Sequence, residues 1–176
     1  DRVGKSGAKF DFDKTKWFNQ QYLRAKSKEE LAQYLQAILK EKGVDASNSF
    51  VAEVCEQLKE RANFVKDMWE EGKYYFTSPK SYDEKTIRKK WKSETPRHMK
   101  ELMDRLKNLA DFTSSSIEAE FKSYLQDNEL AMGRLLPAFR LSLTGLAMGP
   151  SLYDIAELLG KEEAINRIQT ALKTIK

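Results

Sequence analysis

The chain has 176 residues, of which 40% are hydrophobic and 33% charged, with 8 Gly, 4 Pro and a formal net charge of +4. This composition is typical of a globular helical protein and excludes a disordered chain, and no apolar run approaches the roughly 18 to 20 residues that span a bilayer. One cysteine and one histidine exclude an internal disulfide and the usual zinc sites. We therefore expect a cytoplasmic protein without a metal site.

Helix signals begin close to the N-terminal end. The first residue is Asp1 instead of Met, so we expect the chain to be a piece of a longer protein. Asp13 can cap a helix that carries Trp17 and Tyr22. The stretch Ser27-Lys28-Glu29-Glu30 is a capping box, which predicts a second helix from there to a left-handed stop at Gly43.

Two further helices are expected before the middle of the chain. Residues 47–49 open the third helix, and its apolar stripe changes phase near Arg61. A fourth helix then continues to Gly72. The segment TSPKSYD, residues 77–83, lies between periodic segments and predicts a subdomain boundary.

The second half also shows helical spacing. Thr95-Pro96 is a helix start, and Ser115 with Glu118 predicts another one. Pro137 lies within an apolar run, so a helix either begins near it or kinks there. The last two helices are expected at 151–159 and 162–174. Because no alternating strand pattern occurs, the sequence predicts an all-α fold, a two-part helical bundle.

Candidates for catalysis are weak. His98 has no Ser or Cys partner and is interpreted as a surface or partly packed residue. Cys55 lies on an apolar helix face and is interpreted as core. Gly4-Lys5-Ser6 ends like a phosphate-binding loop but lacks the upstream glycine and the preceding strand. We therefore expect no catalytic residue, and a small-molecule enzyme is disfavoured.

Basic residues gather in one part of the chain. Between Lys80 and Lys107 there are ten basic and five acidic residues, a local charge of +5. Within it, KTIRKKWK (85–92) combines cations that can neutralise phosphates with Trp91, which can stack on an unpaired base. The alternative is a solvated helix face with Trp91 turned into the core, and the sequence leaves both open.

Three stretches together resemble the C-terminal anticodon-binding region of bacterial glutamyl-tRNA synthetase. They are FDFDKTKWFNQQYL (10–23), ERANFVKDMWEEGKYYF (60–76) and LLPAFRLSLTGLAMGPSLYDIAELLGKEEAINRI (135–168), of which the last is the most specific. The resemblance covers nearly the whole chain and implies a helical cage. Its implied parts are a connector from an absent catalytic half (1–9), a first anticodon-binding subdomain (10–80) and a second one (81–176).

The resemblance also implies roles for residues of this chain. In the family, the positions matching Arg140 and the loop 146–152 border the first two anticodon nucleotides, and the position matching Arg61 reads the third. Gly149 and Pro150 would let the backbone approach RNA, Ser151 can cap the following helix, and Leu152 would form an apolar wall. Met148 can instead pack under a base. Apart from the resemblance, the basic segment itself supplies the auxiliary phosphate and stacking candidates Lys85, Arg88, Lys89, Lys90 and Trp91.

The implied partners are the anticodon arm of a glutamate tRNA and the catalytic domain of the same parent chain, and we expect a monomer. No cofactor or metal is expected in this fragment, because ATP and Mg²⁺ belong to the parent's catalytic domain. The rival interpretation is a helical protein–protein adaptor, in which residues 146–152 form a hydrophobic docking corner. Without the resemblance, this corner would be a helix–turn–helix junction whose glycines permit close packing.

Overall fold

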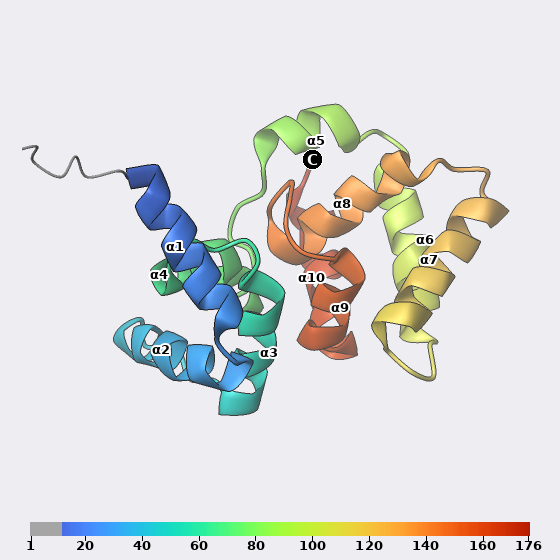
Figure 1. Ribbon diagram of the computed structural model, residues 1–176. Coiled ribbons are helices and arrows are strands. Elements are labelled where there is room, and N and C mark those ends of the chain that lie inside the picture. Colours follow the sequence, from blue (N-terminus) through green and yellow to red (C-terminus); the bar gives the residue numbers. More distant parts are fainter. Residues whose placement is uncertain (1–11) are drawn as a thin grey trace, which may run out of the picture. The chain divides into compact units, whose positions relative to one another are not determined.

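The computed structural model describes residues 12–176 and is all-α, with no strand among these residues (Figure 1). They divide into two compact units, the first ending at Glu70 and the second comprising Glu71–Lys176. The division precedes the predicted boundary at residue 80, and the segment 74–83 bonds to other parts of the second unit. The predicted connector, including Gly4-Lys5-Ser6, lies outside the described residues. Within residues 12–176, none of the helices combines the length and the hydrophobicity that a membrane span requires.

The first unit is built from successive short helices. These are α1 (Phe12–Ala25), α2 (Lys28–Glu41), α3 (Asn48–Leu58) and α4 (Val65–Gly72), within which the division falls. The helix α1 already includes Asp13, so the predicted N-cap at Asp13 is wrong. The apolar faces of α2 and α3 pack together and bury leucines and valines that recur every three or four residues.

Local hydrogen bonds explain where these helices begin and end. Ser27 forms the predicted capping box, with its Oγ accepting from the Glu30 N–H and the Glu30 carboxylate accepting from the Ser27 N–H. At the other end of α2, Gly43 has φ +69°, as expected for a left-handed stop. Ser47 caps α3 through the Phe50 N–H. The structure thus confirms the predicted start and stop of α2 and the start of α3.

The second unit contains the larger core. A 3₁₀ turn η1 (Lys73–Tyr75) is followed by the helices α5 (Glu84–Lys90), α6 (Thr95–Lys107), α7 (Ser114–Asp127), α8 (Met132–Thr144), α9 (Leu152–Leu159) and α10 (Lys161–Thr174). The helices α6–α10 share one apolar core, in which the rings of Phe121 and Phe139 stack with centroids 5.8 Å apart. Tyr82, Ile87 and Trp91 pack on a smaller cluster formed by α8, α10 and Ile175.

Two helix predictions in this unit need correction. The helix α7 is capped by Thr113, whose Oγ1 accepts from the Ser116 N–H, and not by Ser115 with Glu118. The helix α8 begins at Met132 and runs through Pro137, so of the two alternatives the start near Pro137 is wrong, and the kink stays a prediction. Because proline has no N–H, the Gly133 carbonyl one turn earlier loses its helical donor, and the Lys90 Nζ donates to this carbonyl at 3.2 Å.

Candidate nucleic-acid interface

The corner between α8 and α9, residues 145–151, is called the elbow. It starts at Gly145, which has φ +75° and whose N–H bonds to the Leu141 carbonyl. The Gly145 carbonyl accepts from the Asp83 N–H at 2.9 Å, and a Cβ on Gly145 would lie 2.5 Å from the Ser81 carbonyl oxygen. Only glycine therefore fits here, because the elbow passes directly against the segment 79–83.

The tip of the elbow exposes apolar side chains. Leu146 is 40% exposed and Met148 is 73% exposed, while Ala147 between them also faces solvent. Beside Leu146 lies a hollow of about 330 Å³, whose lining includes Thr77, Lys80 and Thr144. A loop that holds apolar side chains in solvent is a candidate contact surface.

Arg140 lies on α8, five residues before the elbow, and is half-buried. Its Nη2 donates to the Pro150 carbonyl at 2.9 Å. A Cβ on Gly149 would lie 3.0 Å from the Arg140 Nη1 and 3.6 Å from the Tyr74 Oη, so the missing side chain makes room for the guanidinium. The structure therefore gives Arg140 and Gly149 a role that the sequence did not predict, which is to brace the elbow from within.

The end of the elbow begins α9. The Ser151 Oγ accepts from the Asp154 N–H, which confirms the predicted cap, and Pro150 is half-buried. Leu152 is only 2% exposed and belongs to the apolar core. Its side chain therefore cannot form the expected apolar wall, and the exposed apolar side chains of this corner belong to Leu146 and Met148.

Arg61 lies in the turn after α3 and is exposed. Its backbone N–H bonds to the Leu58 carbonyl, so the phase change seen in the sequence is the end of α3. Arg61 belongs to the first unit and Arg140 to the second. Their convergence on one RNA therefore stays a prediction.

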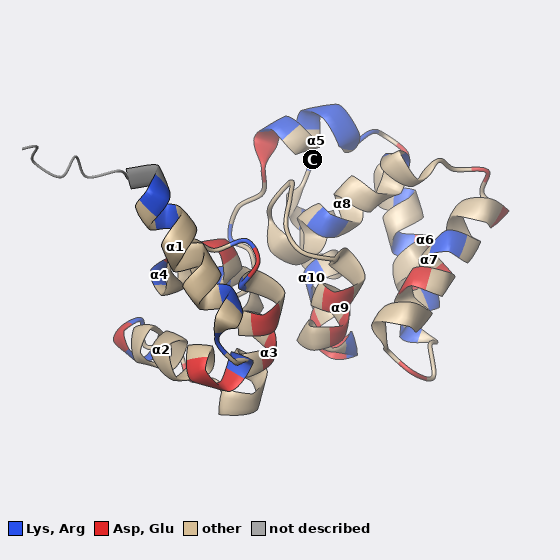
Figure 2. Ribbon diagram, viewed as in Figure 1, with Lys and Arg blue, Asp and Glu red and all other residues tan. Residues whose placement is uncertain are grey.

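The predicted basic segment forms α5, which Figure 2 shows as a mainly blue helix. This helix carries four exposed cations, Lys85, Arg88, Lys89 and Lys90. Trp91, the C-cap of α5, is half-buried against both apolar clusters of the second unit, and its Nε1 is buried. This position favours the packing alternative for Trp91 over base stacking, while the cations remain accessible.

His98 and Cys55 are both buried. The His98 Nδ1 is 2.7 Å from the Tyr124 hydroxyl, which in turn donates to Glu101. Burial, with the nearby Arg97 cation, lowers the pKa of His98. Burial raises the pKa of Cys55 to about 12, so its thiol stays protonated at neutral pH. The described residues contain no group of three or more His, Cys, Asp and Glu side chains that could hold a metal ion.

A buried charge cluster in the second unit was missed by the sequence reasoning. Arg167 on α10 is 3% exposed, and its Nε donates to Glu163 at 2.6 Å. Glu163 and Arg167 are four residues apart, a spacing that predicts an ion pair on a helix. Such pairs normally lie on an exposed helix face, so the spacing did not predict that Arg167 is buried. Burial of Arg167 depends on distant segments that no local pattern reveals.

Comparisons with known proteins point to one family. The family model described as "Anticodon binding domain" matches residues 20–172. The chain is 47% identical over 174 residues to the glutamate–tRNA ligase of Flavobacterium johnsoniae, and the match covers 99% of this chain and 34% of that protein. It is 44% identical over 175 residues to the glutamate–tRNA ligase of Phocaeicola vulgatus, and this match covers 99% of this chain and 35% of that protein. A crystal structure of a glutamate–tRNA ligase from Elizabethkingia meningosepticum superposes with a TM-score of 0.92 at 40% identity, covering 99% of this chain and 34% of that one. The chain therefore spans about a third of the length of the relatives it matches.

Proposed function

Because this chain belongs to the anticodon binding domain family, we propose that it binds the anticodon arm of a glutamate tRNA. The parent protein would be a glutamate–tRNA ligase that joins glutamate to this tRNA with ATP and Mg²⁺ in the cytoplasm. Catalysis would belong to a separate catalytic domain of the parent, and the present chain would act as a monomeric RNA-binding part.

The observation that carries this proposal is the exposed tip of the elbow in a chain that matches the family over residues 20–172. Proteins recognise single-stranded RNA loops by splaying bases out and packing them against side chains. Leu146 and Met148 offer apolar surface for an unstacked base, while Gly149 and Pro150 bring backbone groups close to it. Arg140 supports this role by holding the Pro150 carbonyl through a hydrogen bond.

Cations supply the remaining contacts in this proposal. The exposed Lys85, Arg88 and Lys89 on α5 would neutralise phosphates, because phosphate contacts position a protein without reading sequence. Arg61 would read a base edge with its planar fork, which suits bidentate hydrogen bonds. Trp91 is left out of the contact surface because it packs into the second unit.

The test compares two exposed methionines of the second unit, Met148 at the elbow and Met132 at the start of α8, which is 43% exposed. Fluorescence anisotropy with a labelled anticodon stem-loop gives Kd for the chain and for Met148→Ser and Met132→Ser. Partial burial of a methionine against a base is worth about 1 kcal/mol, so Met148→Ser should weaken binding roughly fivefold. Met132→Ser should leave Kd unchanged, and equal effects of both substitutions would refute the contact at the elbow.

Salt dependence tests the basic helix separately. Replacing Lys85 and Lys89 by alanine should reduce the slope of log K against log salt by about 0.7 to 0.9 for each phosphate that is no longer neutralised. The preference for the cognate loop over a scrambled loop should not change, since these lysines would touch only phosphates. An unchanged slope would remove α5 from the interface.

The rival function is a protein–protein adaptor, and the same exposed Leu146 and Met148 favour it. An adaptor would bind its partner through apolar contacts, so its affinity would be nearly independent of salt and RNA would not compete. If the anticodon stem-loop does not bind even at low salt, the RNA-binding proposal fails and the adaptor becomes the better explanation.

A further inference from the structure

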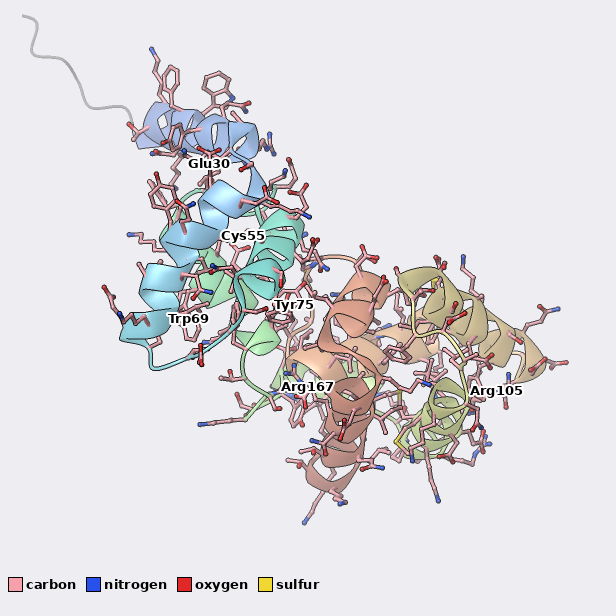
Figure 3. All side chains as sticks on the ribbon, turned by 90° about the horizontal axis from the view of Figure 1, so that it is seen from below. Glu30, Cys55, Trp69, Tyr75, Arg105 and Arg167 are labelled. Carbon is pink, nitrogen blue, oxygen red and sulfur yellow. The ribbon has the colours of Figure 1, made fainter. Side chains whose placement is uncertain are left out.

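The buried guanidinium of Arg167 joins several segments of the second unit. Its Nη1 donates to the Tyr74 carbonyl at 2.6 Å and to the Leu143 carbonyl at 2.8 Å, and its Nε donates to Glu163 at 2.6 Å. Figure 3 labels Arg167 among the helices of this unit. One side chain on α10 thus holds η1 and the end of α8 at the same time.

The carboxylate of Glu163 extends this cluster to the segment that follows η1. The same Oε1 that pairs with Arg167 accepts from the Ser78 hydroxyl at 2.7 Å. Burial by itself raises the pKa of Glu163, but the hydrogen bonds from Arg167 and Ser78 outweigh burial and leave this pKa below its ordinary value. Glu163 therefore stays ionised at neutral pH and keeps both partners in place.

These hydrogen bonds lie next to the elbow but involve none of its residues. Leu143 is one of the last residues of α8, so its carbonyl lacks a helical partner and needs another donor. Gly145, two positions further, accepts from the Asp83 N–H and packs on the Ser81 carbonyl. The segment 74–83 and the start of the elbow are thus fixed to each other, and Arg167 bonds to both sides of that contact.

Stability alone does not account for a buried arginine here. Replacing a buried ion pair by well-packed apolar residues is often neutral or stabilising, because the charges must first be stripped of water. Carbonyls at a helix end can also be satisfied by simpler caps. What the guanidinium adds is a rigid planar fork that reaches two carbonyls and a carboxylate in a defined geometry.

We propose that Arg167, assisted by Glu163 and Ser78, is a positioning residue that holds the segment 74–83 and the elbow in the one arrangement that binds RNA. Arg167 itself is buried and makes no contact with the RNA; it acts through the backbone carbonyls of Tyr74 and Leu143. The RNA-binding part of this inference rests on the proposed function, whereas the positioning part concerns the free protein.

The experiment uses Arg167→Lys, which keeps the charge but loses the fork, and Arg105→Lys as its matched control. Arg105 also lies in the second unit, on α6, and pairs with Glu120 and Asp127 away from Arg167 (Figure 3). Amide hydrogen exchange is followed by NMR at the Asp83 N–H, whose acceptor is the Gly145 carbonyl, and at the Phe121 N–H within α7. Both amides are measured without RNA.

In Arg167→Lys we expect the Asp83 amide to exchange about tenfold faster, because local opening of this contact becomes easier, while the Phe121 amide is unchanged. Arg105→Lys should leave the Asp83 amide unchanged. Equal acceleration of both amides in Arg167→Lys, or no acceleration of the Asp83 amide, would overturn the positioning role. If Arg167→Lys does not fold, Ser78→Ala provides the second variant, with a smaller acceleration expected at the same amide and the same refuting outcomes.

Binding of the anticodon stem-loop then tests the consequence. Arg167→Lys should lower the preference for the cognate loop over a scrambled loop about threefold or more, with an unchanged salt slope, because the elbow is displaced while the phosphate contacts remain. A retained preference would overturn the link between Arg167 and RNA reading. If the wild-type chain binds no RNA, the proposed function fails, and the exchange rates alone still decide whether Arg167 positions the elbow.

Discussion

Replacing Gly145 by alanine should destabilise the protein more than the same replacement at Gly43, the left-handed glycine that ends α2. Alanine at φ +75° costs about 1 to 2 kcal/mol by itself. Its Cβ would also lie 2.5 Å from the Ser81 carbonyl oxygen and 3.1 Å from the Pro79 Cβ. Because one of these atoms is backbone and cannot rotate away, the clash should add about 1 to 3 kcal/mol, as overpacking does in cores. The expected loss is therefore about 2 to 5 kcal/mol.

Gly43→Ala is the control, since Gly43 has a similar φ of +69° but a Cβ added to it would meet nothing within 4 Å. Urea unfolding followed by far-UV circular dichroism gives the free energy of unfolding for both variants. Gly43→Ala should lose only the conformational part, about 1 to 2 kcal/mol. If Gly145→Ala loses no more than Gly43→Ala, the close approach of the elbow to the segment 79–83 is refuted.

Three further changes test other parts of the structure. Gly133→Ala should stabilise the protein by up to about 0.5 kcal/mol, because Gly133 lies in the first turn of α8 with open space around it, and a lower melting temperature would contradict this. Ser27→Ala should cost about 1 kcal/mol of unfolding free energy in urea melts by removing the capping box of α2, and an unchanged free energy of unfolding would contradict this. The pKa of His98 in the folded state lies below its unfolded value of 6.5, so its contribution to stability is full above pH 6.5 and is lost as the pH falls below that value. Between about pH 7.5 and 5, the melting temperature of His98→Gln should therefore fall less than that of the unsubstituted protein. Parallel curves of melting temperature against pH for the two proteins would exclude this role.

Local features of the sequence determined the all-α class and the ends of several helices. The caps at Ser27, Ser47 and Ser151 and the stop at Gly43 depend on hydrogen bonds between residues a few positions apart and on the φ of one residue. Such interactions are nearly independent of the remaining chain, so they can be read from the residues themselves. The position of the elbow followed in the same way from the small residues that begin at Gly145.

The orientation of the side chains at the candidate site depends on packing between distant segments. The resemblance implied an apolar wall at Leu152, and the sequence left Trp91 open between base stacking and packing, but the burial of both depends on which neighbouring helices pack against them. The hydrogen bond from Arg140 to the Pro150 carbonyl could not be read from the sequence, whereas a place for Arg140 beside the anticodon stays a prediction. Arg167 finds an acceptor 93 positions away at Tyr74. The sequence shows that an arginine is present, but whether its charge can be buried depends on hydrogen-bond acceptors from distant segments. Only folding brings these acceptors within reach of the guanidinium.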